Sequence, residues 1–145
     1  MKTNIIEIED YLELAKLFKE NGLELNLNKA PEHFVTCWKA LDQNSELLGG
    51  VSIEYKKGEY VIGDIAVQKK YRKSNIGSEL LVTALNRIKK LGGKKVYLVA
   101  KAPKFFEKFG FDYIKAEDMP PISNCLTCEQ FKVTCFPELM CLKKL

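Results

Sequence analysis

One continuous stretch constrains the fold most: an apolar strand pattern that runs through a basic turn into a strongly periodic helix. Residues 62–67 have strand composition, residues 68–75 contain four basic side chains, and apolar residues then recur on one helical face from Ile76 to Leu91. The first turn of a helix has unpaired N–H groups and a positive dipole end, so phosphate oxygens bind there well. The turn has neither the G-x-G-x-x-G pattern of dinucleotide-binding folds nor the P-loop pattern. A phosphate site and an ordinary strand-to-helix turn both fit this segment.

The rest of the chain predicts the fold class. Before this stretch we expect a strand at 4–8, a helix from Tyr11 to Phe18, a loop or broken helix at 23–31, and strands near 33–41, 46–55 and 59–67. After it we expect a strand at 95–100, a helix opened by Pro103 and closed by Gly110, and a last strand within 138–145. The order predicts an α/β (α+β) fold, with a mixed, mainly antiparallel sheet of six or seven strands and helices on both faces.

The composition narrows the class of protein. Hydrophobic residues make up 46% and charged residues 29% of the 145 residues, which is typical of one globular domain. No apolar run approaches the roughly 18 residues of a membrane span, and the start at Met1 has no apolar secretory core. We therefore expect a cytoplasmic protein with no membrane partner.

The charge is unevenly distributed. Residues 66–115 contain 13 of the 23 Lys and Arg but three of the 19 acids, so this segment carries +10 and the remainder −6. Such a block indicates a polyanionic ligand, either nucleic acid or a phosphorylated cofactor. A solvated helix face is the plainer alternative.

Five cysteines leave a metal site open. Cys37 stands alone, whereas four others have the spacing C-x2-C-x6-C-x5-C: Cys125, Cys128, Cys135 and Cys141. The odd total argues against a disulfide framework. The first pair has zinc-knuckle spacing, but the second half is less typical of a compact four-cysteine site, so packed thiols are favoured over structural metal.

Two segments resemble motifs of the GNAT superfamily of acetyltransferases. Residues 72–77, Arg-Lys-Ser-Asn-Ile-Gly, are similar to the family's pyrophosphate-binding pattern Arg/Gln-x-x-Gly-x-Gly/Ala, with Asn75 in place of the first glycine. Asn is among the few residues that accept a left-handed backbone. Residues 105–111, Phe-Phe-Glu-Lys-Phe-Gly-Phe, resemble the family's aromatic-Tyr-Glu-Lys-Leu-Gly-Phe signature.

The resemblance implies an acetyl-CoA-dependent N-acetyltransferase that works by direct attack of an amine. Backbone groups around Ile65 and Val67 would bind the pantetheine arm, and an N–H group near Val67 would polarise the thioester carbonyl. The cofactor contacts are assigned to Ile65, Val67, Arg72, Lys73, Ser74, Asn75, Gly77, Ser78 and Phe106. One domain, 1–145, would comprise an N-terminal part at 1–60, an acetyl-CoA-binding core at 61–114, and a cysteine-containing loop with the final strand at 115–145.

Two departures from the family pattern bear on catalysis. The tyrosine that often protonates the leaving thiolate falls on Phe106, and the asparagine that often contacts pantetheine falls on Ala100. Tyr113 is then a candidate acid, and Asp64, three residues before Val67, is a candidate base acting through water. An ordinary polar or structural role for Asp64 is the alternative.

The acceptor is expected to be a primary amine on a small molecule. The segment around 105–111, with Asp118-Met-Pro-Pro and the C-x2-C loop, also resembles the amino-acid acetyltransferase branch that includes N-acetylglutamate synthase, which suggests an amino acid. A catalytically inactive CoA-binding or regulatory module is the main alternative, and nucleic-acid binding is a lesser one. Formation of a homodimer is left open.

Overall fold

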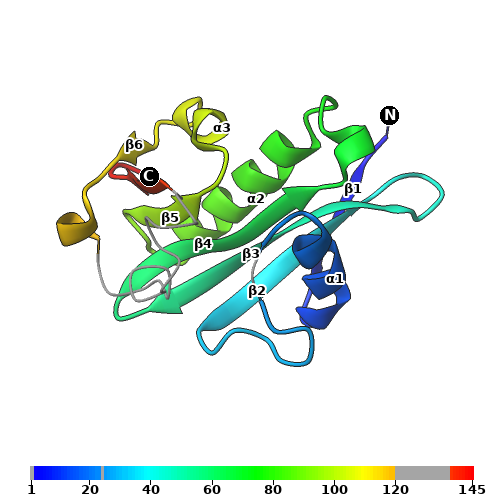
Figure 1. The fold of residues 1–145 in the computed structure, drawn as a ribbon, viewed down its shortest axis with the longest axis horizontal. Coiled ribbons are helices and arrows are strands. Elements are labelled where there is room, and N and C mark those ends of the chain that lie inside the picture. The colour runs from blue at the N-terminus through cyan, green and yellow to red at the C-terminus, as the bar shows by residue number, and fades with distance from the viewer. Residues whose placement is uncertain (1, 24, 120–137) are drawn as a thin grey trace.

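Seven strands in the described part of the chain form one sheet, in the order β1-β2-β3-β4-β5-β7-β6 (Figure 1). The computed structural model describes residues 2–23, 25–119 and 138–145. The strands are β1 (Asn4–Ile8), β2 (Phe34–Leu41), β3 (Leu47–Lys56), β4 (Glu59–Val67), β5 (Val96–Ala100), β6 (Asp112–Tyr113) and β7 (Glu138–Leu142). The helices are α1 (Leu12–Glu20), α2 (Ile76–Lys90) and α3 (Pro103–Glu107), with short 3-10 turns at Lys69–Tyr71 and Ala116–Asp118.

The sheet is mixed and mainly antiparallel, as predicted. Strands β1 to β4 form an antiparallel meander, β4 and β5 are parallel, and β7 pairs antiparallel with both β5 and β6. The parallel pair needs a crossover, and α2 supplies it.

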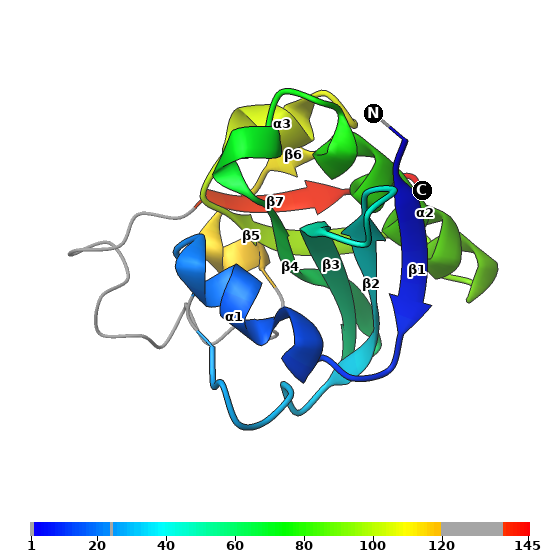
Figure 2. The same cartoon turned by 90° about the vertical axis from the view of Figure 1, so that its right-hand side faces the viewer.

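Helices cover both faces of the sheet, which also confirms the prediction. Cys37 packs in a cluster with Tyr11 and Phe18 of the α1 region, whereas its neighbour Trp38 packs in the larger core with Leu80, Leu81 and other residues of α2. Because successive strand residues point to opposite faces, α1 and α2 lie on opposite sides of the sheet. Figure 2 shows the sheet running between them.

An ion pair connects β1 at the sheet edge to α2. Arg87 donates from Nη2 to Glu7 Oε1 at 2.6 Å and from Nη1 to Glu7 Oε2 at 2.8 Å, and Thr36 Oγ1 donates to the same carboxylate at 2.7 Å. The guanidinium also lies 5.3 Å from the centre of the Trp38 ring. These hydrogen bonds, above all the one from Arg87, lower the pKa of Glu7 to about 2.

Candidate active site

Strands β4 and β5 part after a short parallel contact. They pair at Tyr60 with Val96 and at Val61 with Tyr97, after which β4 runs on to Val67 and β5 to Ala100 without further pairing between them. Beyond this contact the facing backbone edges of the two parallel strands are not paired with each other, and we call the region between them the wedge. It lies at the carboxyl ends of parallel strands, where ligands of α/β sheets commonly bind.

The backbone of β4 presents hydrogen-bonding groups to this wedge. Gln68 N–H donates to the Leu48 carbonyl at 2.8 Å, so residues 48 and 68 form a hydrogen-bonded pair of the antiparallel ladder. The pairs on β4 alternate from there, and Val67 opposite Gly49 and Ile65 opposite Val51 are therefore non-hydrogen-bonded pairs. Their N–H and C=O groups point away from β3 and toward the wedge.

A β-bulge in β4 precedes these groups. The register steps from Val51–Ile65 to Ile53–Ile62, so two residues of β4, Gly63 and Asp64, lie opposite Ser52 alone. The Asp64 N–H donates to Ser52 Oγ at 2.9 Å, which satisfies the bulged backbone. The extra residue sends the Asp64 side chain to the α1 face of the sheet, where Tyr11 contacts it.

The turn between β4 and α2 ends in free backbone donors. Asn75 has φ 64° and ψ 8°, which confirms the expectation that an asparagine here adopts the left-handed conformation. It makes no side-chain capping bond, and the Glu79 N–H is the donor to the Asn75 carbonyl at 3.1 Å. The N–H groups of residues 76–78 thus have no partner within the helix, and they point out of its positive end.

The missing side chain at Gly77 leaves space for a ligand and is not required by packing within the protein. A Cβ atom at this position would lie 3.4 Å from Phe105 Cζ and 3.6 Å from Val67 Cγ2, which are ordinary van der Waals distances. Packing within the protein therefore does not demand glycine at 77. A bound group that approaches the helix N-terminus closely would demand it.

The Arg72 side chain folds back and hydrogen-bonds two other segments of the protein. Its Nε donates to the Val67 carbonyl at 3.2 Å and its Nη2 to Asn21 Oδ1 at 2.6 Å. Among the predicted phosphate contacts, Arg72, Lys73, Ser74 and Asn75 are exposed, whereas Gly77 and Ser78 are half-buried. The turn therefore offers backbone donors at its inner end and charged side chains at its outer end.

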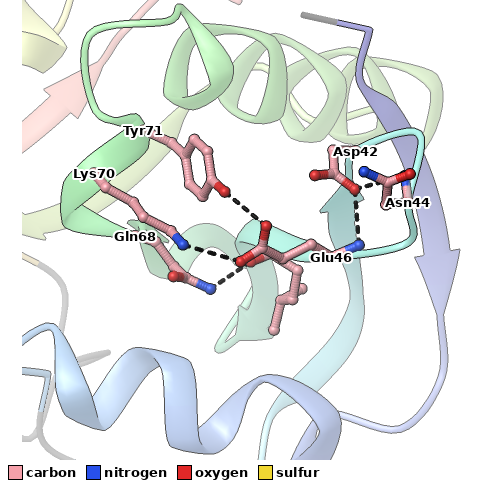
Figure 3. A network of polar contacts seen from close by, with 7 residues as sticks. Asp42, Asn44, Glu46, Gln68, Lys70 and Tyr71 are labelled. Atoms are coloured by element: carbon pink, nitrogen blue, oxygen red, sulfur yellow. Dashed lines mark hydrogen bonds and ion pairs between the residues drawn. The ribbon is translucent and has the colours of Figure 1, made fainter.

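Polar contacts anchor the turn to the start of β3 (Figure 3). Lys70 Nζ lies 3.1 Å from Glu46 Oε1, Tyr71 OH donates to Glu46 Oε2 at 2.7 Å, and the Gln68 side chain donates to the Leu47 carbonyl. All three side chains leave the turn toward residues 46–47, where β3 begins. The contacts fix the direction in which the chain enters α2.

Two carboxylates lie near the bulge on the α1 face. Asp64 Oδ2 accepts hydrogen bonds from Tyr11 OH at 2.7 Å and from Ser52 Oγ at 3.4 Å. Burial raises the pKa of Asp64, while these two hydrogen bonds oppose the shift. Burial also raises the pKa of Glu54, to about 7, and the negative charge of Asp64 adds to that shift.

Sequence analysis missed Glu54. Part of the signal was available, because the turn between the strands expected at 46–55 and 59–67 brings Glu54 opposite Val61, three residues from Asp64; the bulge that turns Asp64 to the same face was not. An acid beside another acid is an unusual pairing, because a like charge nearby disfavours ionisation, and here the charge of Asp64 adds to the rise in the pKa of Glu54 that burial causes.

Tyr113 lies apart from the wedge and the turn, whereas Phe106 packs against Phe105, which lines the position of Gly77. Tyr113 is on β6, separated from β4 by β5 and β7, or about 14 Å at the usual strand spacing. The Glu107 carboxylate near its hydroxyl raises the pKa of Tyr113. Phe106 is buried, with ring centres 5.0 Å from Phe105 and 5.8 Å from Phe111. The structure thus brings Asp64, Ile65, Val67 and the 72–78 turn together but places Tyr113 apart from them.

The described cysteines are buried thiols. Cys37 and Cys141 are free, and burial raises the pKa of Cys37 to about 12. Cys125, Cys128 and Cys135 lie outside the described residues, so the metal hypothesis remains open. Within 2–23, 25–119 and 138–145, no group of three or more His, Cys, Asp or Glu could hold a metal ion. In the same ranges no helix has the length and apolar character to cross a membrane.

A parted parallel strand pair beside a free helix N-terminus defines the class of fold that the sequence motifs implied. The family model of the acetyltransferase (GNAT) family matches residues 5–111, so the chain belongs to this family.

Individual relatives are distant. The amino-acid acetyltransferase of Aeromonas salmonicida (strain A449) is 24% identical over 120 residues, which are 80% of this chain and 27% of that protein. The chain thus spans about a quarter of the length of that curated relative. A GNAT-family acetyltransferase from Staphylococcus aureus Mu50 superposes with a TM-score of 0.73 at 19% identity, over 97% of this chain and 98% of that one. N-acetylglutamate synthase from Neisseria gonorrhoeae, complexed with coenzyme A and N-acetyl-glutamate, superposes with a TM-score of 0.72 at 12% identity, over 100% of this chain and 36% of that one.

Proposed function

We propose that this protein transfers the acetyl group of acetyl-CoA to a primary amine of a small molecule. The observation that carries the proposal is the wedge between β4 and β5, which opens next to the free N–H groups of α2. The extended pantetheine arm of the cofactor needs the wedge, and its pyrophosphate needs the free N–H groups. Family membership supports the same cofactor.

Each part of the cofactor then has a partner on the protein. The N–H groups at 76–78 bind the pyrophosphate, helped by Lys73 and Ser74, and Gly77 allows the close approach. The outward backbone groups of Ile65 and Val67 pair with the amides of the pantetheine arm, as an added strand would. A free N–H of β4 near Val67 polarises the thioester carbonyl, because negative charge develops on that oxygen as the amine attacks.

The transfer needs no covalent intermediate on the protein. The bound thioester carbonyl lies in the wedge, and an amine that reaches it from the α1 face attacks the carbonyl carbon directly. Holding both reactants in this geometry supplies much of the acceleration. The CoA thiolate is a fairly good leaving group, so solvent can protonate it, whereas Tyr113 lies on β6, three strand spacings from β4.

An amino acid is the candidate acceptor. The similarity to the amino-acid acetyltransferase of Aeromonas salmonicida supports it, and so does the fold shared with N-acetylglutamate synthase. The chain covers a small part of both proteins, and the acceptor is therefore best identified with a panel that also contains polyamines and amino sugars.

Calorimetric titration with acetyl-CoA tests the cofactor site. We expect saturable binding, and absence of binding at millimolar ligand would refute the proposal. A thiol-release assay across the amine panel then tests catalysis, because each transfer liberates one CoA thiol.

A second candidate is a CoA-binding module without catalysis. Two residues favour it. Phe106 is buried and has no hydroxyl, and Ala100 has no side-chain amide to contact pantetheine. Turnover with any amine of the panel excludes it, whereas tight acetyl-CoA binding with no turnover would establish it.

A further inference from the structure

Glu54 lies on the face of the sheet from which an acceptor amine would approach. Its neighbour Ile53 packs in the core on the α2 face, so Glu54 points to the opposite face, where Asp64 meets Tyr11. The 72–78 turn leads directly into α2. A pyrophosphate bound at this turn therefore places acetyl-CoA on the α2 side of the wedge. The two carboxylates are then on the side of the amine.

The Glu54 carboxylate rests on the bulge itself. A Cβ atom at Gly63 would collide with Glu54 Oε2 and lie 2.9 Å from Ser52 Oγ. Gly63 precedes Ile65 by two residues, about 6–7 Å along a strand. That distance is too long for one bridging water, so a chain of two or more waters connects the carboxylate to an amine at the thioester near Val67.

The two carboxylates differ in their hydrogen bonds. Asp64 accepts from both Tyr11 and Ser52, whereas no hydrogen bond to the Glu54 carboxylate is found within the described residues. The charged and titratable groups that act on Glu54 are Asp64 from β4, Tyr11 from α1 and Lys56 from its own strand. Asp64 is thus fixed in place, and Glu54 is left free to exchange a proton.

From this arrangement we infer that Glu54 is the proton acceptor for the amine and that Asp64 is a positioning residue that holds a negative charge beside it. The inference rests on the proposed acetyl transfer and adds the residue that enables it. A pKa of about 7 suits the role, because a general base works best when its pKa is near the working pH.

The reaction balances with one proton released. The acceptor ammonium gives a proton to Glu54 through water, and the neutral nitrogen uses its lone pair to form the C–N bond. The C–S bond breaks and its electron pair stays on sulfur. The second nitrogen proton passes through solvent to the thiolate, which yields the amide and CoA thiol, and Glu54 returns its proton to solvent.

The pH dependence of thiol release separates Glu54 from Asp64. For the parent, kcat/KM should rise through about pH 7 as Glu54 loses its proton, apart from any rise at the pKa of the amine itself. Glu54→Gln should lower kcat/KM by about 100-fold and abolish the rise near pH 7 while acetyl-CoA affinity is retained. Glu54→Asp should keep the rise.

Asp64→Asn should keep the rise but move it to lower pH, because the charge that raises the pKa of Glu54 is gone. Glu59→Gln, which removes the same charge from the hairpin end of β4, is the matched control and should leave the profile unchanged. If the rise survives in Glu54→Gln and is lost in Asp64→Asn, Asp64 is the base and the inference is wrong.

An infrared titration decides the matter without turnover. In the difference between the parent and Glu54→Gln, the band of a protonated carboxyl should disappear with a midpoint near pH 7. A midpoint below about pH 5, the ordinary range of Glu, would overturn the inference. A parent that binds acetyl-CoA, shows the midpoint near 7 and acetylates no amine would refute the proposed transfer instead.

Discussion

Replacing Gly77 with Asp tests the cofactor site most directly. The position lies in the first turn of α2, between Phe105 and Val67, and a Cβ atom fits there at ordinary contact distances. An aspartate in the first turn of a helix also interacts favourably with the helix dipole, by about 0.3–1 kcal/mol. The variant should therefore fold at least as well as the parent.

Its effect should fall on the ligand. A phosphate oxygen bound to the N–H groups at 76–78 would lie about 4 Å from the new carboxylate. Two unit charges at that distance repel by about 1 kcal/mol in water and about 4 kcal/mol near a protein surface. An exposed helix end lies between these limits, so we expect a loss of about 2–3 kcal/mol. Acetyl-CoA affinity should then fall by at least about 30-fold.

Gly77→Asn separates charge from shape in the same position. The amide has the size of the carboxylate but no charge, so it should lose clearly less affinity than Gly77→Asp. Calorimetry with acetyl-CoA measures both, and circular dichroism with thermal unfolding confirms that each variant is folded. If folded Gly77→Asp binds acetyl-CoA as tightly as the parent does, the turn at 72–78 is not the cofactor site.

Three other outcomes follow from single contacts. Arg72→Ala should weaken acetyl-CoA binding by about tenfold in calorimetry, because the backbone donors remain when one partly solvated charge is lost; a loss larger than that of the Asp variant at 77 would contradict this. Glu7→Gln should destabilise the protein by about 1 kcal/mol at neutral pH, after discounting for the exposure of its pair with Arg87. Since the folded pKa of Glu7 is lowered from 4.5 to about 2, its contribution is complete above about pH 4.5 and is lost as pH falls through 2; a parent-to-variant difference in urea unfolding that grew in acid would refute the pairing. Iodoacetamide at about pH 8 should leave Cys37 and Cys141 unmodified in the folded protein, as peptide mapping can show, and labelling of Cys37 before unfolding would contradict its burial.

The long elements could be predicted because their periodic patterns are local. The helix expected from Ile76 to Leu91 is α2 at Ile76–Lys90, and the strand expected at 95–100 is β5 at Val96–Ala100. The two-residue strand β6 was not predicted, because two residues carry no alternation. In the segment 23–31, expected to be a loop or a broken helix, the described residues 23 and 25–31 contain no helix.

The site was predictable where it depends on backbone and less so where it depends on side-chain neighbours. A left-handed Asn75 follows from the residue type alone, and it was anticipated. The hydrogen bonds that direct Arg72 to Asn21 and Val67 join segments far apart in the sequence. The environment of Glu54 likewise depends on the register between β3 and β4 and on one bulged residue, which no periodic pattern reveals.

That bulge links the two halves of the site. Without the extra residue, strict alternation from Ile62 would turn Asp64 toward the α2 face with Ile62 and would turn Ile65 away from it. The observed register instead keeps Ile62 and Ile65 in contact with the α2-side core while Asp64 meets Tyr11 on the other side. A single strand can thereby offer backbone groups to a cofactor that arrives over α2 and carboxylates to an amine that arrives over α1. The fully buried Ser52 hydroxyl accepts a hydrogen bond from the bulged Asp64 N–H. This bond stabilises the bulge and therefore the face of the sheet to which each side chain points. The side chain that secures the bulge therefore also determines on which face of the sheet we expect the proton to be removed.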